Sequence, residues 1–319
     1  GKLTDTWPVN FDDNPSSEGF ANQDGNTAQE LYNDDIFVGY RYYDTFGVDV
    51  SYPFGYGGSY TSFAMSTKSV KADKDKVTVQ VKVKNTGTVS GKEVAEVYFS
   101  APDGELDKPY QELAGYAKTD ELAPGESQIL TISFDTKEMG SYDTDKAAYV
   151  MEDGDYIIRV GNSSRNTHVA AKLNVAEDTI TEQYSNLMVP VTENDNIENS
   201  DKYPTLEPMT TEGATSITYD GEANEIAAAK TIEVDFTGYK APEIIKENED
   251  VTVYTSDTTE EKYLFAKNED GATGTISRVE KANANNTDYS VTYQEHVKKF
   301  DGDYSKNTLK DVYDGKISL

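Results

Sequence analysis

The chain has 319 residues, with 58 Asp and Glu against 29 Lys and Arg, so its formal net charge is −29. This length is enough for about two domains, each with its own core. The absence of cysteine excludes a disulfide scaffold, a thiolate metal site and a cysteine nucleophile, and His168 and His296 are too few for a multi-histidine metal site. So acidic a chain also lacks the basic residues that binding to nucleic acid or to an anionic membrane surface requires.

The first 66 residues are irregular and aromatic, and they are rich in glycine, aspartate, asparagine and proline. Turn sequences occupy residues 11–29. The run from Ile36 to Tyr43 has the apolar and aromatic composition of a strand. The stretch that follows, as far as Gly58, holds too many glycines for the interior of a regular element. We therefore do not expect this opening to be a self-contained domain.

Residues 67–176 carry the pattern of short strands. Val77, Val79, Val81 and Val83 alternate with polar residues, which predicts a strand with one buried face and one wet face. Turn sequences separate the further short apolar runs, which are 94–99, 129–134, 148–150, 156–160 and 169–175. About seven short strands with a turn every dozen or so residues are typical of an antiparallel β-sandwich.

The rest of the chain is predicted as a linker followed by a second small β-rich region. Residues 177–210 are acidic and interrupted by prolines, with Lys202 as their only base, which favours an extended connector or a segment that drapes over a neighbouring domain. Strand-like alternation returns in residues 211–307, and the alanine-rich run from Glu222 to Lys230 predicts one short helix. The predicted fold class is therefore mainly β, with a sandwich, an acidic linker and a second β-rich region.

No residue stands out as catalytic, cofactor-binding or metal-binding. Adjacent carboxylates such as Asp12-Asp13 and Asp34-Asp35 are more often turn or surface residues than a catalytic pair. No segment has the spacing of a calcium-binding loop, a nucleophile elbow or a phosphate-binding glycine loop. We expect His168 to be a surface residue at the end of a strand rather than a general base.

Tyrosine is abundant, at 23 residues, and it suits half-buried strands and sugar-stacking surfaces alike. The candidate stacking faces are Tyr40, Tyr42 and Tyr43, and Tyr289 and Tyr293. Aromatic residues at alternate strand positions usually belong to the core, so packing is the favoured interpretation. A stand-alone carbohydrate-binding or adhesive module remains the alternative, and an elongated cell-surface stalk of tandem β domains is a third.

Two stretches and a set of short motifs resemble a known family. Residues 32–44 read YNDDIFVGYRYYD and residues 52–63 read YPFGYGGSYTSF. The short motifs are Val83–Gly87, Gly91–Val94, Leu113–Tyr116, Leu122–Glu126, Gly154–Tyr156 and Arg159–Gly161. Together they resemble glycoside hydrolase family 3, which includes β-glucosidases and β-xylosidases. Residues 67–176 are similar to that family's fibronectin type III-like domain, and residues 1–8 resemble the last stretch of its α/β sandwich domain.

The resemblance implies a non-catalytic structural segment of a retaining enzyme that acts on terminal β-D-glucosides or β-D-xylosides. The family's catalytic aspartate and glutamate lie on a barrel and on the α/β sandwich, and no position of this chain matches either motif. Residues 1–66 are then the tail of the α/β sandwich domain with an aromatic, glycine-rich connector. Residues 308–319 resemble the lead-in to the barrel in members with reversed domain order.

The expected partners follow from the same resemblance. They are the enzyme's catalytic domains and, through them, β-linked oligosaccharides. No cofactor, nucleic acid or membrane contact is implied, and the chain alone is expected to be inactive. A bacterial secreted or cell-surface location is favoured over the cytoplasm. Two departures from the family pattern stand out: Asp34-Asp35 replaces a common Glu-Gly, which puts a glycine-dependent turn in doubt, and Gly58 replaces an apolar leucine.

Overall fold

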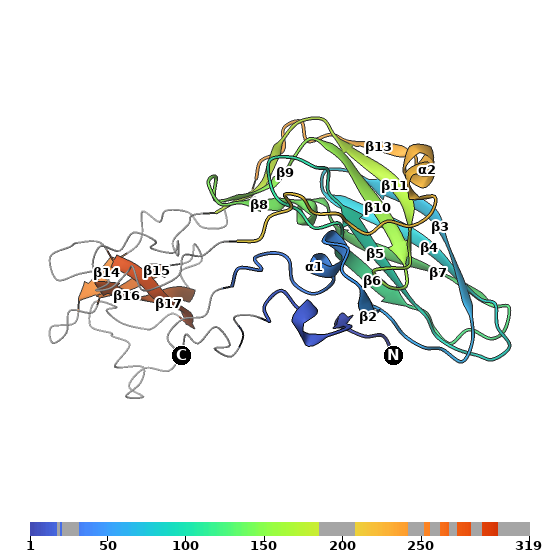
Figure 1. The fold of residues 1–319 in the computed structure, drawn as a ribbon. Coiled ribbons are helices and arrows are strands. Elements are labelled where there is room, and N and C mark those ends of the chain that lie inside the picture. The colour runs from blue at the N-terminus through green and yellow to red at the C-terminus, as the bar shows by residue number, and fades with distance from the viewer. Residues whose placement is uncertain are drawn as a thin grey trace. The chain divides into compact units, whose positions relative to one another are not determined.

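The computed structural model describes residues 1–17, 20, 32–184 and 208–241, together with the backbone of four strands between residues 252 and 298. The chain divides into two compact units (Figure 1). The first contains residues 1–183 and 203–242, and the second contains residues 184–202 and 243–319. No helix in the described part is long and apolar enough to cross a membrane.

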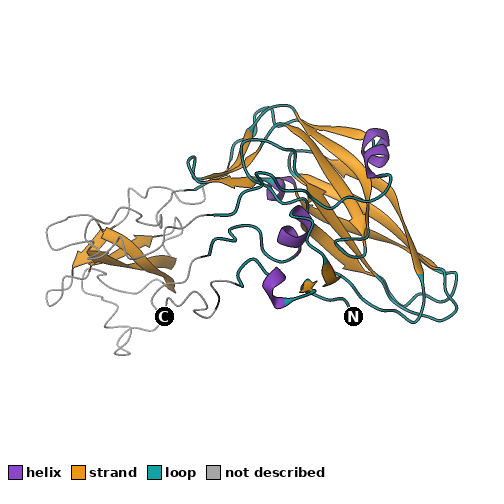
Figure 2. Ribbon diagram, viewed as in Figure 1, coloured by secondary structure: helices purple, strands orange, loops and turns teal. Residues whose placement is uncertain are grey.

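The first unit is a β-sandwich, as predicted (Figure 2). One sheet has the strand order β3-β4-β7, from Phe63–Ala72, Lys76–Asn85 and Ser127–Asp135. The facing sheet has the order β13-β11-β10-β5-β6, from Thr231–Val234, Thr167–Val175, Gly154–Gly161, Val94–Ser100 and Glu112–Lys118. The sandwich thus begins at Phe63 rather than at residue 67, because β3 precedes the first clear alternation.

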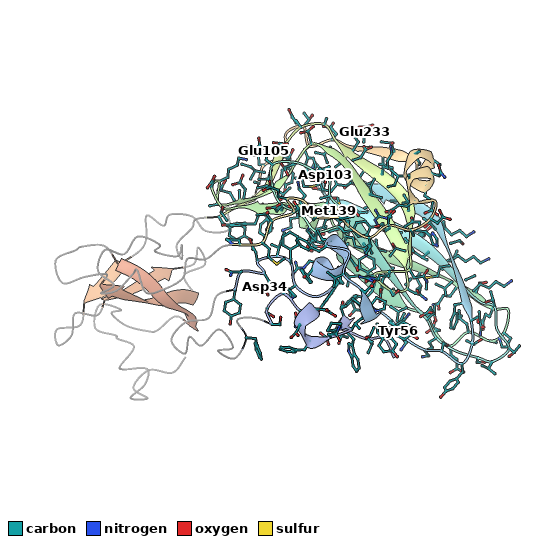
Figure 3. All side chains as sticks on the ribbon, viewed as in Figure 1. Asp34, Tyr56, Asp103, Glu105, Met139 and Glu233 are labelled. Carbon is teal, nitrogen blue, oxygen red and sulfur yellow. The ribbon has the colours of Figure 1, made fainter. Side chains whose placement is uncertain are left out.

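The core lies between these two sheets and follows the predicted alternation. The four alternate valines of β4 are fully buried, and Val79 and Val81 lie beside Ile132 and Leu130 of the antiparallel neighbour β7. From the other sheet, Tyr156, Ile158 and Leu173 are fully buried in the same cluster. Figure 3 shows Met139 within this side-chain-filled region, and its exposure is 1%. Burial at about 1.5–3 kcal/mol per large apolar side chain makes this cluster the main source of stability.

A small three-stranded sheet extends one end of the sandwich. It has the order β12-β9-β8, from Thr179–Gln183, Ala148–Met151 and Ser141–Asp143. The 3-10 helix η3, Thr136–Met139, links β7 to this sheet. Residues 179–183 of the expected linker therefore continue the sandwich unit as β12, while residues 185–207 lie outside the described residues.

The segment before the sandwich covers the outer face of the five-stranded sheet. Its elements are the paired strands β1 and β2 (Trp7–Pro8 and Val50–Tyr52), η1 (Phe11–Asp13) and the helix α1 (Tyr40–Thr45). The strand composition of residues 36–43 is misleading, since the backbone turns at Gly39, with φ of +60°, into one and a half turns of helix. The helix forms because it buries Tyr43, Asp44 and Thr45 against the sandwich, and this tertiary contact outweighs the β-propensity of the aromatic residues.

The turn before α1 keeps a left-handed residue without a glycine. Asp35 has φ of +48° at the position where the family commonly has glycine. Aspartate tolerates this region better than most L-residues because its short side chain can bond locally. Gly58, in place of an apolar residue, has open space around its Cα. The turn is therefore preserved with aspartate at position 35. At position 58, glycine means that no side chain makes a contact.

Restoring glycine at position 35 is expected to stabilise the protein. The left-handed conformation costs an L-residue about 1–2 kcal/mol, and Asp35→Gly removes this cost. The substitution also makes the unfolded chain more flexible, which lowers the gain by about 0.5–1 kcal/mol. The expected result is a rise in the free energy of unfolding of about 0.5 kcal/mol, read from urea midpoints. Asp34→Gly is the matched control and should lower stability, because Asp34 has no positive φ. Equal effects of the two substitutions would contradict this account.

The chain returns to the sandwich after residue 207. We call residues 208–241 the strap. Within it, the predicted helix forms as α2, Glu222–Ala228, and β13 then adds to the sheet parallel to β11, with Leu173 opposite Ile232. The alternation at Ile232 and Val234 thus completes the edge of the first sandwich rather than starting a separate domain, and Val234 is 4% exposed in its core. The expected β-rich region 211–307 is accordingly divided between the two units.

The second unit contains a four-stranded antiparallel meander of strand order β14-β15-β16-β17. The bounds are Thr252–Thr255, Lys262–Lys267, Thr273–Lys281 and Tyr289–Lys298. These strands coincide with the strand-like alternation of the sequence in this part of the chain. The predicted lead-in at residues 308–319 lies outside the described residues.

Candidate functional site

The segment before the sandwich is fixed to it by a buried polar network around Asp44 of α1. The Asp44 side chain is 1% exposed and accepts a hydrogen bond of 2.8 Å from Nε of Arg165. Arg165 also donates through Nη2 to the carbonyl oxygens of Tyr43 and Val48, at 3.1 and 2.7 Å. Gln111, fully buried, donates to Asp44 at 3.4 Å. One arginine of the sandwich therefore holds the C-terminal half of α1 and the turn that follows it.

Burial dominates the electrostatics of this network. It raises the pKa of Asp44, and the hydrogen bond and charge of Arg165 only partly oppose the rise. Tyr40 lies alongside, with its ring centroid 5.0 Å from that of Phe54 and 5.9 Å from that of Tyr98. Its hydroxyl accepts a hydrogen bond of 2.8 Å from the backbone N–H of Leu113, and burial raises its pKa to about 12. The Tyr40 hydroxyl therefore stays protonated near neutral pH and is suited to positioning rather than to proton transfer.

A second network joins the strap to the sandwich through Arg159 of β10. Arg159 is 2% exposed, its Nη1 lies 2.6 Å from Oε1 of Glu222, and its Nε donates to Ser100 Oγ at 2.8 Å. Glu222 also accepts hydrogen bonds of 2.6 Å from the Tyr110 hydroxyl and 2.7 Å from Thr218. The guanidinium carbon of Arg159 lies 4.8 Å from the centroid of the Tyr110 ring. Residues far apart in sequence thus form one ion-paired cluster.

A further carboxylate of the strap covers the edge of β11. Glu225 accepts hydrogen bonds of 2.9 Å from the N–H of Val169 and 2.7 Å from the hydroxyl of Tyr219. Its other oxygen lies 3.1 Å from Nδ1 of His168, which is exposed at the start of β11. The expected surface position of His168 at a strand end is therefore where the structure places it.

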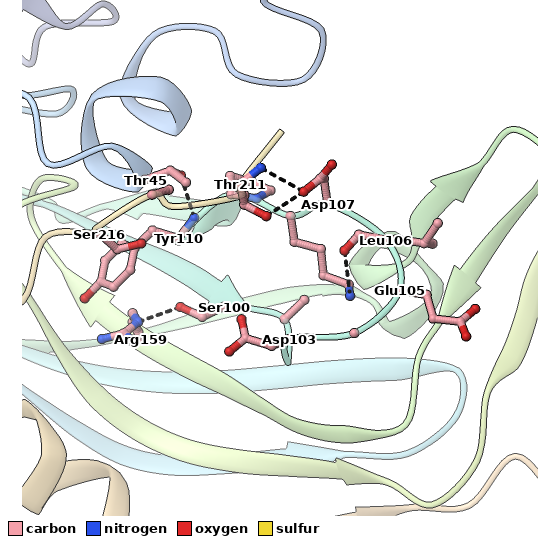
Figure 4. Close-up of a pocket in the computed structure, with 15 residues that line it drawn as sticks. Thr45, Ser100, Asp103, Glu105, Leu106, Asp107, Tyr110, Arg159, Thr211 and Ser216 are labelled. Atoms are coloured by element: carbon pink, nitrogen blue, oxygen red, sulfur yellow. Dashed lines mark hydrogen bonds between the residues drawn. The ribbon is translucent and has the colours of Figure 1, made fainter. Parts of the chain in front are cut away.

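Between the loop 101–110 and the strap lies a polar cavity of about 520 Å³, which we call the loop cavity (Figure 4). Three of its lining residues, Thr45, Ser100 and Arg159, are buried. Its other lining residues come from the loop and the strap, and they include Asp103, Glu105, Asp107, Lys108, Tyr110, Thr211 and Ser216. The strap closes one side, where Asp107 accepts hydrogen bonds from the N–H and hydroxyl of Thr211.

The loop that forms this cavity is anchored from below by Glu152. That carboxylate is 6% exposed, accepts hydrogen bonds from the N–H groups of Glu105 and Leu106 at 2.6 and 3.3 Å, and is paired with Lys108. Gly104 passes so close that a Cβ there would lie 2.5 Å from Oε2 of Glu152. A side chain at position 104 would therefore displace the Glu152 carboxylate from the loop that it anchors.

Acid is expected to loosen the strap. Burial opposes ionisation of Glu222 and of Glu225, but the bonds from Tyr110 and Thr218 to the first, and from Tyr219 and the Val169 N–H to the second, lower both pKa values overall. A carboxyl group whose pKa is lowered by folding stabilises the folded state at pH values above its pKa in the unfolded chain, which is about 4.3 for glutamate. This stabilisation is lost as the pH falls through the pKa of the folded state.

Hydrogen exchange along the strap measures this effect directly. Protection of residues 217–234 is expected to fall between neutral pH and about pH 3.5, and the double variant E222Q/E225Q should be nearly insensitive over that range. The measurement must be local because burial raises the pKa of Asp44, Glu96 and Glu112 elsewhere in the unit. Protonation of these three carboxyls at low pH favours the folded state and would offset the effect of the strap in a global measurement of stability. Unchanged protection in the wild-type strap at low pH contradicts the prediction.

The tyrosines suggested as sugar-stacking platforms are not presented as a face. Tyr43 is 3% exposed, and Tyr42 packs between Tyr43 and Phe46 at centroid distances of 5.1 and 5.2 Å. Together with the enclosed Tyr40 ring, they form the packing of α1. Tyr289 and Tyr293 belong to β17, whose side chains lie outside the described part of the chain. No group of three or more potential metal-ligating side chains occurs among the described residues.

Sequence reasoning missed the two buried arginine pairs, although each left a signal. Arg159 interrupts the apolar run of residues 156–160, and Asp44 follows three aromatic residues within five positions. A charge inside a segment expected to be buried requires a partner. The partners, Glu222 and Arg165, come from other parts of the chain, so the sequence signal marks the charged residue but not the pair.

Known proteins are similar to this chain over about 60% of its length. The family model described as "Fibronectin type III-like domain" matches residues 93–164. The chain is 40% identical over 213 residues to beta-glucosidase A of Butyrivibrio fibrisolvens and 42% identical over 198 residues to a beta-glucosidase of Ruminococcus albus. Each match covers 60% of this chain, but only 25% and 20% of those relatives.

Solved structures agree with the sequence relatives. The crystal structure of a beta-glucosidase from Paenibacillus barengoltzii matches with a TM-score of 0.55 and 45% identity over 58% of this chain and 21% of that one. Beta-glucosidase 3B from Thermotoga neapolitana matches with a TM-score of 0.53 and 42% identity over 56% and 25%. The chain therefore spans about a fifth to a quarter of the length of the relatives it matches.

Proposed function

Because the chain carries the fibronectin type III-like region of glycoside hydrolase family 3, we propose that it is the non-catalytic structural segment of a longer β-glucosidase. The parent enzyme hydrolyses terminal β-D-glucosides with retention of configuration. Glucosides are preferred to xylosides in this proposal because the named relatives are β-glucosidases. Its partners are the catalytic domains of the same enzyme, with β-linked oligosaccharides bound through them.

The observation that carries the proposal is the buried pair between Asp44 and Arg165. It fixes α1, and with it the family-like stretch of residues 32–63, against the end of the sandwich. A rigid attachment of this kind sets the position of whatever is joined to the segment. In enzymes, a displacement of about 1 Å at the reacting groups can lower the rate about 100-fold. The sandwich thus contributes to catalysis by positioning.

The outer side of the same segment supports an attachment to further protein. Trp7, Phe11 and Tyr56 are 54%, 54% and 45% exposed, and the Trp7 and Tyr56 rings both lie near that of Tyr52. Figure 3 shows Tyr56 on this side of the first unit. Clustered exposed aromatic residues mark interaction surfaces more often than free surface. We infer that the catalytic domains of the parent cover this face.

Two measurements test the proposal. The 319-residue chain should not hydrolyse an aryl β-glucoside, whereas the intact product of the natural gene, purified with protease inhibitors, should hydrolyse it. That product should also have a mass far above the 35.2 kDa of this chain. Turnover by the 319-residue chain, or a native product of 35.2 kDa, overturns the proposal.

A further inference from the structure

The loop cavity offers buried hydrogen-bond donors. Arg159 has five N–H donors, and its Nη1 makes no hydrogen bond of acceptable geometry despite lying 2.6 Å from the Glu222 carboxylate. Ser100 accepts from Arg159 Nε, so its own hydroxyl hydrogen is directed elsewhere. The Ser100 hydroxyl hydrogen and the N–H groups of Arg159 that are not directed at Glu222 or Ser100 can therefore donate to a ligand oxygen in the cavity.

The rim of the same cavity offers acceptors. Asp103 and Glu105 are exposed, and their carboxylates form no hydrogen bond within the described part of the chain (Figure 4). The third rim carboxylate, Asp107, is engaged by Thr211 of the strap. Ser216, exposed on the strap, adds a hydroxyl that can donate or accept. Donors and acceptors therefore line one space of ligand size, with Asp103 on the same side as Ser100 and Arg159 (Figure 4).

The charges exclude most other ligand classes. Rim carboxylates repel an anion, and the positive charge of Arg159 is already paired with Glu222. A cation would approach the guanidinium of Arg159 and the ammonium of Lys108 in the walls. A strongly apolar ligand would leave these polar groups unsatisfied. A neutral molecule with many hydroxyl groups, each both donor and acceptor, fits all of these conditions.

We propose that the loop cavity binds a neutral sugar of one or two rings. Its volume of about 520 Å³ falls within the range of about 300–1,000 Å³ usual for small-molecule sites. Hydroxyl groups of the sugar accept from Arg159 and Ser100 and donate to Asp103, and the Tyr110 side chain bounds the ring. The site belongs to the sandwich unit, and sugar binding there does not depend on the proposed enzymatic role.

The test uses cellobiose as the probe and the whole 319-residue chain as the protein. Saturation-transfer difference NMR, which reads the signals of the sugar, should show saturable binding. A dissociation constant of about 10 mM or tighter is expected from a few hydrogen bonds at a partly hydrated site. Inorganic phosphate, as an anionic competitor, should not displace the sugar.

Three variants locate the binding. Ser216→Trp places a large side chain over the cavity from an exposed position and should abolish the signal. Asp103→Asn should weaken binding about three- to tenfold, since it removes a charged acceptor. Asp49→Asn is the matched control, an exposed carboxylate outside the cavity, and should leave the affinity unchanged. Circular dichroism confirms that each variant is folded.

Several outcomes overturn the proposal. They are the absence of saturable binding, an unchanged affinity in both cavity variants, or displacement of cellobiose by phosphate. These outcomes are separate from the test of the proposed function, because binding is measured without hydrolysis. Hydrolysis of an aryl β-glucoside by the chain would overturn the structural role and leave this binding result intact.

Discussion

Replacing Glu222 with alanine is expected to lower the free energy of unfolding of the sandwich unit by about 3–5 kcal/mol. The change leaves Arg159, whose side chain is 3% exposed, charged and without its ion-pair partner. It also removes the acceptor of the Tyr110 and Thr218 hydroxyls. Urea-induced unfolding followed by near-UV circular dichroism measures the loss, because tyrosines report on packing within this unit.

Two further variants separate charge from packing in this cluster. Glu222→Gln keeps an oxygen acceptor but removes the charge, so its effect should lie between those of wild type and Glu222→Ala. Glu233→Ala is the control on the same strap; Glu233 is exposed on β13 (Figure 3), and its loss should change stability by less than about 0.5 kcal/mol. A Glu222→Ala variant as stable as Glu233→Ala shows that the ion pair does not hold the strap.

The second large effect is expected at Arg165. Arg165→Met keeps much of the apolar stem but leaves the Asp44 carboxylate, 1% exposed, without a counter-charge, and it removes the side-chain donor to the carbonyl oxygens of Tyr43 and Val48. We expect a loss of about 3 kcal/mol at pH 7. The segment of residues 32–58 should become more accessible to limited proteolysis, and, under the proposed function, the activity of the longer enzyme should fall with it.

The pH dependence of this loss identifies its cause. Burial already raises the pKa of Asp44, and removal of Arg165 raises it further. A carboxyl with a raised folded pKa binds its proton more tightly when folded, so its unfavourable contribution shrinks as the pH falls. Arg165→Met should therefore be less destabilising at pH 4.5 than at pH 7, and adding Asp44→Asn should recover part of the loss. A loss independent of pH points to packing alone.

The predictable part of the fold is the part with a strong local pattern. The four alternate valines of β4 indicate their own burial, and the short apolar runs separated by turn sequences indicate the other strands of the sandwich. The helix α1 was not predictable in this way, since its aromatic residues favour a strand locally and become helical only against the sandwich. Asp35 shows the same limit, because a family pattern marks the turn while the conformation depends on its surroundings.

The candidate sites depend on contacts that the sequence does not encode locally. Arg159 is visible as an anomaly in an apolar strand, yet the pairing with Glu222 requires the strap to return across β11. The loop cavity likewise combines residues 100–110 with residues 211–216, on either side of a region that reads as a linker. The pattern of one sequence predicts individual strands and helices. It does not predict which distant segments fold together to form these sites.

The parallel pairing of β11 with β13 has a consequence for synthesis. During translation, residues 172–175 emerge well before their partners at residues 231–234, and this non-local pairing is slow to form because the long intervening loop must close first. Until then, the edge of β11 presents unpaired backbone groups, which are prone to pair with other chains. The nascent sandwich is therefore expected to complete its sheet only after the strap has left the ribosome, and ribosome-bound chains that end between β11 and β13 should be the form that aggregates or recruits chaperones.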